Sequence, residues 1–141
     1  MAFQLAPRIN AAGRMASPDL AARLLLLVDE TQLDEARALA RQLGEENTRR
    51  QSEERAIVEA AKQLIEKDPS VGAHNVLVVA GEGWHRGVIG IVASKLVETY
   101  AKPAVVLSMD GDMAHGSCRS ISAFDMLGGL ERCEDLFERF G

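Results

Sequence analysis

The sequence lacks the marks of a membrane, secreted or zinc-stabilised protein. No apolar run approaches the roughly 20 residues that a membrane-spanning helix needs, and the first seven residues lack the basic start and apolar core of a signal peptide. The only cysteines, Cys118 and Cys133, have neither metal-site spacing nor the density of a disulfide framework. We therefore expect a cytoplasmic protein with reduced thiols, no structural zinc and no membrane association.

Basic residues are too few for a uniformly basic surface. The chain has 16 Lys and Arg against 21 Asp and Glu, which gives a net charge of -5. Binding of nucleic acid through an extended surface draws on many Lys and Arg contacts to phosphates. The charge excludes such a surface but leaves room for a local anion site, because several arginines lie in glycine- or serine-rich settings.

The sequence also lacks recognisable arrangements of catalytic residues that would cleave a bond. The three histidines, His74, His85 and His115, have no carboxylate neighbours at metal-ligand spacing, and no aspartate cluster resembles a two-metal site. No Ser/His/Asp arrangement is recognisable either. The residues present therefore predict binding and positioning.

What is present is the composition of a soluble globular protein, with 47% hydrophobic and 26% charged residues in 141. We expect an α/β fold with a helical N-terminal part, a long connecting helix, and a small mixed β-sheet domain flanked by helices. The corresponding divisions are residues 1–30, 31–68 and 69–141. The chain stops directly after an amphipathic helix, which indicates an excised piece.

The N-terminal part is predicted to hold a loop and a helix. Residues 5–15 are rich in Pro, Gly and Asn, which favours an ordered loop with at most a helical turn. Ser17 is the expected N-cap of a helix over residues 19–28, with Pro18 at the first helical position. Its Ala and Leu content predicts burial of most of its surface.

The longest element is a helix from Thr31 to Lys67, about 55 Å long at 1.5 Å per residue. We expect the Thr31 hydroxyl to cap it, with Asp34 as the acidic partner. Its stripe is apolar at both ends and polar in the middle. The middle is either a solvated midsection or a surface facing another domain or cleft. The stripe comprises Leu33, Ala36, Ala40, Leu43, Asn47, Arg50, Glu54, Ile57, Ala61 and Leu64.

The residues after Pro69 predict a mixed sheet. A strand, a helix and a second strand should form a right-handed crossover with parallel strands. The turn at residues 110–112 then predicts an antiparallel third strand. The expected strands span residues 75–80, 104–108 and 113–120, and the expected helices span residues 88–99, 123–133 and 134–140.

Two stretches could carry binding chemistry. The loop at residues 81–87 follows a parallel strand, where α/β proteins bind ligands, and offers a helix N-terminus with Trp84, His85 and Arg86. The alternatives are that Trp84 only packs and that His85 only caps the helix.

The second stretch, GSCRSI at residues 116–121, predicts a phosphate pocket at the end of a strand. Strand alternation puts Ser117 and Arg119 on one face and Cys118 and Ser120 on the other. A guanidinium beside a hydroxyl makes an economical anion site. The alternative is an exposed polar edge strand.

Four motifs, in order, resemble the RecJ single-stranded-DNA-specific exonucleases of the DHH family. They are LAPRINAAGRM at residues 5–15, Asn47-x-x-Arg50 with Glu54, WHRGVIGIVA at residues 84–93, and GSCRSI at residues 116–121. The first and third are the most specific. The resemblance covers nearly the whole chain.

The resemblance implies a piece of RecJ comprising the end of the catalytic DHH region, the connecting helix, and most of the DHH-associated domain. The family hydrolyses single-stranded DNA from the 5′ end with manganese or magnesium held in the DHH region, and serves recombination and repair. Those metal motifs are absent, so this piece alone should be inactive. The implied partners are single-stranded DNA and the upstream catalytic domain, and an uncovered apolar surface would favour a homodimer.

The resemblance also implies roles for residues. Ser117 and Arg119 match positions expected to grip a 5′-terminal phosphate, joined by Arg8 or Arg14. Gly116, Ser120, Asn10 and His85 are the further expected phosphate or DNA contacts, and the expected cleft or inter-domain residues are Trp84, Arg86, Asn47, Arg50 and Glu54. Two alternatives stay open: a DHH phosphodiesterase acting on oligoribonucleotides or nucleotides, and a non-catalytic module that binds nucleic acid or a partner protein.

Overall fold

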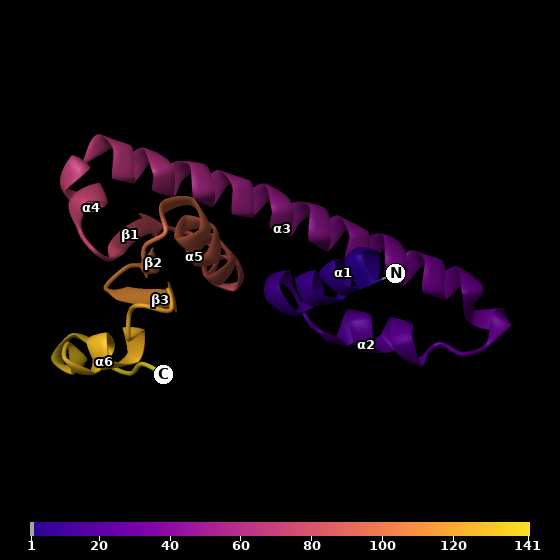
Figure 1. Ribbon diagram of the computed structural model, residues 1–141. Helices are drawn as coiled ribbons and strands as arrows, with labels where there is room; N and C mark the ends of the chain where they lie inside the picture. Colours follow the sequence, from indigo (N-terminus) through magenta and orange to yellow (C-terminus); the bar gives the residue numbers. More distant parts are fainter. Residues whose placement is uncertain (1) are drawn as a thin grey trace. The chain divides into compact units, whose positions relative to one another are not determined.

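The computed structural model describes residues 2–141, with side chains from Leu5 onward. Met1, the first residue of the predicted 1–30 region, lies outside this range. The chain forms two compact units, residues 1–56 and 57–141. Figure 1 shows the helices and strands of both units, coloured along the sequence. The predicted combination of helices, a long connecting helix and a small mixed sheet is confirmed. None of the described helices is long and apolar enough to cross a membrane.

Helix α1 spans Ala2–Met15, so the prediction of a loop at residues 5–15 is wrong. Pro7 lies inside the helix, where it removes one backbone hydrogen bond. Ala11 and Ala12 are fully buried, and Met15 is nearly so. Packing of this small apolar face overrides the weak helix propensities of Pro, Gly and Asn, because tertiary contacts supply most helical stability.

Helix α2 spans Asp19–Leu26, so it ends two residues before the predicted end, and its N-cap residue is Pro18 and not Ser17. The Ser17 hydroxyl still accepts a hydrogen bond from the Asp19 backbone N–H at 3.1 Å. The expectation of extensive burial is wrong, because only Ala21 is buried. Leu25 and Leu26 are 61% and 77% exposed, since only one face of this short helix packs against its neighbours.

Asp29, and not Thr31, caps the next helical segment. Its side chain accepts a hydrogen bond from the Thr31 N–H at 2.9 Å, and Gln32 completes a capping box. That backbone hydrogen bond lowers the pKa of the Asp29 carboxyl. This carboxylate, two residues before Thr31, accepts charge-assisted bonds from the free N–H groups, which explains why it replaces the Thr31 hydroxyl as the cap.

A 3₁₀ turn at Glu30–Gln32 leads into helix α3, Leu33–Lys67, which ends before Asp68 as predicted. Its buried stripe differs from the predicted one at both ends, where Leu39 and Ile65 are buried while Ala40 and Leu64 are exposed. A real helix of 3.6 residues per turn drifts from any fixed alternation of three and four steps over this length. A short helix, α4, follows at Pro69–Ala73.

In the second unit, strands β1 (Leu77–Glu82), β2 (Ala104–Asp110) and β3 (Met113–Arg119) form a sheet in the order β1-β2-β3. β1 and β2 are parallel, and β2 and β3 are antiparallel, which confirms the crossover and the hairpin. Gly111 provides the positive φ of 58° that the hairpin turn requires.

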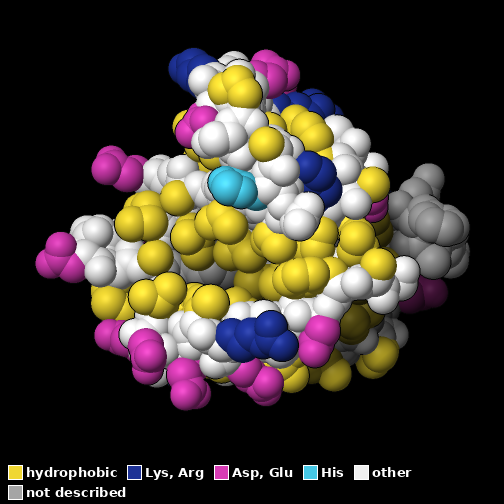
Figure 2. Space-filling model, turned by 60° about the vertical axis from the view of Figure 1, so that its left-hand side comes forward, with side chains coloured by type: hydrophobic (Ala, Val, Ile, Leu, Met, Phe, Trp, Pro, Cys, Tyr) yellow, Lys and Arg dark blue, Asp and Glu magenta, His cyan; other side chains and the backbone are white. Residues whose placement is uncertain are grey.

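Helix α5, Arg86–Tyr100, covers one face of this sheet (Figure 1). It begins two residues earlier than predicted. The core between them contains Leu77, Val106 and Leu96, which are fully buried. Alternation leaves the opposite sheet face more open, with Val78 51% exposed. Figure 2 shows hydrophobic side chains gathered on one face of the molecule, with acidic side chains along its lower edge.

The C-terminal helices are shorter than predicted. Helix α6 spans Met126–Glu131, capped by Asp125, and the second expected helix is reduced to a 3₁₀ turn at Glu134–Leu136. Leu136 is 80% exposed and Phe137 is 38% exposed. Without a buried apolar face, so short a segment gains too little to continue as an α-helix.

The core of the first unit provides a stability test. Leu43 is 1% exposed and clusters with Ala12 and Ala21, so Leu43→Ala should lower the free energy of unfolding by about 3 kcal/mol through lost burial and a cavity. The matched control Leu26→Ala, at a side chain that is 77% exposed, should change it by less than about 0.5 kcal/mol. Denaturant unfolding of both variants measures this difference, and equal losses would contradict the packing described.

Candidate anion-binding site

Ser117 and Arg119 project from β3 on the sheet face that α5 covers. Ser117 pairs with buried Val106, and Arg119 pairs with buried Ala104. A Cβ atom placed on Gly90 of α5 would lie 3.0 Å from Ser117 Oγ and 3.1 Å from Arg119 Nη2. The hydroxyl and the guanidinium predicted to share a face therefore lie together, against the same point of one helix.

The guanidinium of Arg119 is held by its own strand. Nη1 donates to the Cys118 carbonyl oxygen at 2.7 Å and to Ser117 Oγ at 3.4 Å. Both bonds use Nη1, so within the described chain the N–H groups of Nη2 and Nε remain for a ligand. Ser117 is half-buried and Arg119 is exposed. The pair therefore combines a hydroxyl donor held in place by the strand with a positive charge that a ligand can reach.

The neighbouring residues of the motif have structural contacts. Gly116 lies under the Leu107 side chain, since an added Cβ would be 2.9 Å from Leu107 Cδ2. Ser120 Oγ donates to the Phe124 carbonyl oxygen at 2.7 Å and so stabilises the turn after β3. Burial raises the pKa of the Cys118 thiol, against the opposing charge of Arg119. The reactive thiolate is therefore disfavoured at neutral pH.

His85 is the N-cap residue of α5. Its Nδ1 accepts a hydrogen bond from the Gly87 N–H at 3.1 Å. The neutral ring then carries its proton on Nε2, which makes that atom a donor. The capping alternative for His85 is thus observed, and it orients the imidazole without using its outer nitrogen.

Trp84 packs against the end of β1, the strand that precedes it. Its indole ring lies where a Gly81 side chain would be, and its carbonyl oxygen accepts a hydrogen bond from Ser108 Oγ at 2.5 Å. Arg86 forms an exposed ion pair with Asp110 at 2.9 Å, joining the start of α5 to the end of β2. Such surface pairs contribute at most about 1 kcal/mol.

These loop residues border a hollow of about 560 Å³ at the carboxyl ends of β1 and β2. Ligands bind at this edge in α/β sheets, and a ligand site at residues 81–87 stays a prediction. A hollow of similar volume, about 570 Å³, lies along α6. That one is lined mainly by a single short helix and includes none of the predicted site residues. The lining of the first comprises Glu82, Gly83, Trp84, His85, Arg86, Ser108, Met109, Asp110 and Gly111.

Sequence reasoning does not single out two residues that shape this region, Ser108 and Gly90. Ser108 is 3% exposed and fixes the Trp84 carbonyl group. The sequence feature that could have identified Ser108 is a hydroxyl side chain within an otherwise apolar strand. The signal for Gly90 is a glycine inside a helical pattern, a position that costs stability and usually has a packing or functional reason.

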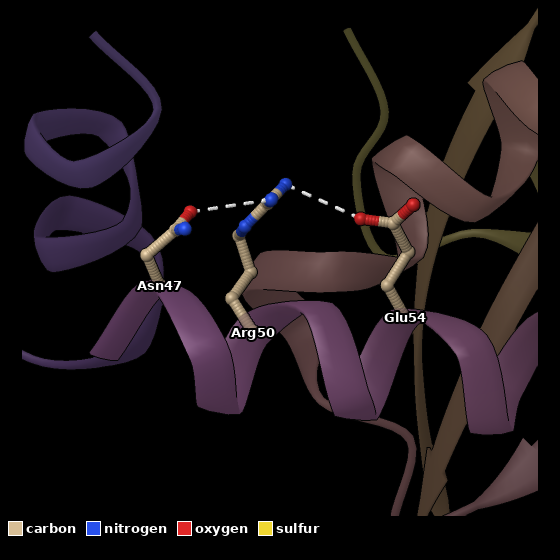
Figure 3. Close-up of polar contacts among 3 residues, drawn as sticks. All are labelled: Asn47, Arg50 and Glu54. Carbon is tan, nitrogen blue, oxygen red and sulfur yellow. Dashed lines mark hydrogen bonds and ion pairs between the residues drawn. The ribbon is translucent and has the colours of Figure 1, made fainter. Parts of the chain in front are cut away.

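On the predicted stripe in the middle of α3, Glu54 is buried and Asn47 and Arg50 are partly buried, so this side of the midsection is not fully solvated. Arg50 Nη1 donates to Glu54 Oε2 at 3.2 Å, and Nη2 donates to Asn47 Oδ1 at 3.4 Å. The side chains of Arg50 and Glu54 are only 16% and 9% exposed. Figure 3 shows the three side chains in a row on one side of the helix. In the described structure, Glu46 Oε2 and Arg50 Nε are buried without hydrogen-bond partners.

The remaining predicted contacts lie on α1. Arg8, Asn10 and Arg14 are exposed residues of the first unit, whereas Ser117 and Arg119 belong to the second. Asn10 and Arg14 are four residues apart and therefore neighbours on the helix surface. Whether Arg8 or Arg14 joins the site stays a prediction.

The side chains that could bind a metal ion are scattered in this structure. Across residues 2–141, no group of three His, Cys, Asp or Glu side chains could hold a metal ion. A metal of the kind that the family resemblance implies does not fit the residues that the structure describes.

The fold and the motif at the end of β3 resemble those of a known domain. Residues 73–141 match the DHHA1 domain. Over its whole length the chain is related to the RecJ exonucleases. It is 39% identical to the single-stranded-DNA-specific exonuclease RecJ of Bacillus subtilis, over 99% of this chain and 17% of that protein.

Solved structures agree with this relationship. The crystal structure of RecJ from Thermus thermophilus in complex with Mg²⁺ matches with a TM-score of 0.82 and 36% identity, over 99% of this chain and 21% of that one. A crystal structure of exonuclease RecJ bound to manganese matches with a TM-score of 0.81 and 35% identity, over 99% of this chain and 33% of that one. The chain thus spans a third or less of each protein.

The buried ion pair on α3 generates a second test. Glu54→Ala leaves the Arg50 guanidinium buried without this carboxylate, and breaking a buried pair in this way should cost about 3 kcal/mol of unfolding free energy. Glu59→Ala, which removes an exposed carboxylate from the same helix, is the matched control and should be nearly neutral. If chemical denaturation gives the same stability for both variants, the Arg50–Glu54 pair is not a structural element of the helix.

Proposed function

We propose that this chain is the substrate-binding part of a metal-dependent, 5′-to-3′ single-stranded-DNA exonuclease of recombination and DNA repair. The observation that carries the proposal is the pairing of the Ser117 hydroxyl with the Arg119 guanidinium on one face of β3. The names of the relatives, single-stranded-DNA-specific exonucleases, supply the substrate class.

The chemistry of the pair favours a phosphate ligand. A guanidinium offers planar N–H donors that match phosphate oxygens, and its hydrogen bonds are charge-assisted. The Ser117 hydroxyl adds a neutral donor beside it. A terminal phosphate presents more charge and more free oxygens than a backbone diester, so a site with both donors should prefer a 5′-phosphorylated end.

Other residues would extend the binding site along the DNA strand. Arg8 or Arg14 would add a second guanidinium, and the donor at His85 Nε2 is available to a backbone phosphate. Contacts to phosphate fix the register of DNA without reading its bases. Binding should therefore be independent of sequence and weakened by salt.

Hydrolysis would depend on the rest of the parent protein. Both crystal structures compared above contain a divalent metal, by their descriptions, and we propose that the parent uses manganese or magnesium held outside this chain. The 141-residue chain by itself would bind DNA without cleaving it. Its partner within the parent would be the upstream catalytic domain.

Affinity for two forms of one oligonucleotide tests this function. Arg119→Ala should weaken binding of the 5′-phosphorylated form by about tenfold or more, since a hydrogen bond to a charged group contributes about 1.5–3 kcal/mol. Binding of the 5′-hydroxyl form should change much less. Fluorescence anisotropy of the 141-residue chain with both labelled oligonucleotides measures the two affinities.

The matched control is Arg41→Ala, which removes one exposed arginine from α3 with the same change in net charge. It should lower both affinities slightly and equally. If Arg119→Ala also weakens both forms by the same factor, Arg119 contributes only general charge and the terminal-phosphate site is wrong.

A further inference from the structure

Gly90 lies in the first half of α5, buried against the sheet. Glycine within a helix is less favourable than alanine, because the unfolded chain loses more backbone freedom. Gly90 is not among the residues with positive φ, so its backbone conformation does not require glycine. The reason for glycine here is therefore spatial.

The space over Gly90 is filled by the two polar groups of the anion site. A Cβ at this position would meet Ser117 Oγ at 3.0 Å, Arg119 Nη2 at 3.1 Å and Ser117 Cβ at 3.8 Å. The first two distances are shorter than ordinary van der Waals contact. By contrast, Gly13 and Gly44, also within helices, have nothing within 4 Å of an added Cβ.

We propose that Gly90 is a positioning residue of the anion site, and that its bare Cα forms the floor on which the Ser117 hydroxyl and the Arg119 guanidinium lie side by side. The inference rests on the proposed phosphate-binding function and deepens it. Gly90 itself contributes no donor through a side chain. It determines where the donors of two other residues can be.

A methyl group at position 90 would displace the two donors unequally. Ser117 is held by strand pairing with Val106, so its hydroxyl can only rotate about the Cα–Cβ bond. The Arg119 side chain is exposed, so the guanidinium has room to move away from α5. The two donors would then no longer converge on one phosphate group, while the sheet could remain intact.

A purely structural role predicts a different result. If Gly90 only lets α5 approach the sheet, Gly90→Ala would change stability and would weaken all ligands together. Positioning predicts loss of selectivity for a 5′-phosphate over a 5′-hydroxyl. The ratio of these two affinities therefore separates the roles, and thermal unfolding reports separately on the fold.

The experiment compares wild type, Gly90→Ala and Gly44→Ala by anisotropy with 5′-phosphorylated and 5′-hydroxyl forms of one single-stranded oligonucleotide. Gly90→Ala should lower the affinity ratio about tenfold, the size expected for losing one charge-assisted hydrogen bond. Gly44→Ala adds the same methyl group to a helix where there is room, and should leave the ratio unchanged. An unchanged ratio in Gly90→Ala would overturn the inference.

A second pair of variants guards against misfolding of Gly90→Ala. Ser117→Ala removes the atom closest to the added methyl group, so Gly90→Ala should cause a smaller further loss in that background than in wild type. Equal losses in both backgrounds would contradict the proposed contact.

Failure of the phosphate site itself would look different. A wild-type chain that binds both oligonucleotides equally overturns the proposed function and this inference together. A different outcome would count against Gly90 alone. In that outcome the wild type and Gly90→Ala both prefer the 5′-phosphorylated oligonucleotide, whereas Arg119→Ala has lost this preference.

Discussion

The close approach of α5 to strand β3 is the constraint on which the candidate site depends. It brings a helix backbone within contact distance of Ser117 and Arg119, through a position that carries no side chain. Helix α5 packs on β2 and β3, and its crossover from β1 to β2 follows from the parallel pairing of those two strands. Addition of β3 by the hairpin then puts a polar strand end under the same helix.

The long helix α3 obeys a second constraint, the burial of a charged pair in its middle. Burying Arg50 and Glu54 without each other would be expensive, whereas together they satisfy much of their hydrogen-bonding capacity. Arg50 Nε remains without a partner in the described structure. A buried ion pair of this kind adds little net stability. It does require that the side chains packed against the middle of α3 be compatible with a charged pair, and such selectivity suits a helix that connects two units.

Local periodicity was sufficient to predict the sheet and the shared face of Ser117 and Arg119, because strand alternation fixes side-chain direction. It failed where tertiary packing or competing caps decide the outcome. The buried face of α1 holds a helix despite Pro7, and the Asp29 carboxylate replaces the Thr31 hydroxyl as cap. The proximity of Gly90 to Ser117 could not be predicted, since the distance between a helix and a strand depends on packing that no local pattern encodes.

Phosphorus NMR would test the central claim, recognition of a terminal phosphate by Ser117 and Arg119, most directly. In a 5′-phosphorylated oligonucleotide the terminal monoester and the backbone diesters give separate resonances. A guanidinium beside the monoester favours its dianion, so saturation with the 141-residue chain should shift that resonance and lower the apparent second pKa of the terminal phosphate. Equal shifts of monoester and diester resonances, with an unchanged monoester pKa, would contradict terminal-phosphate recognition.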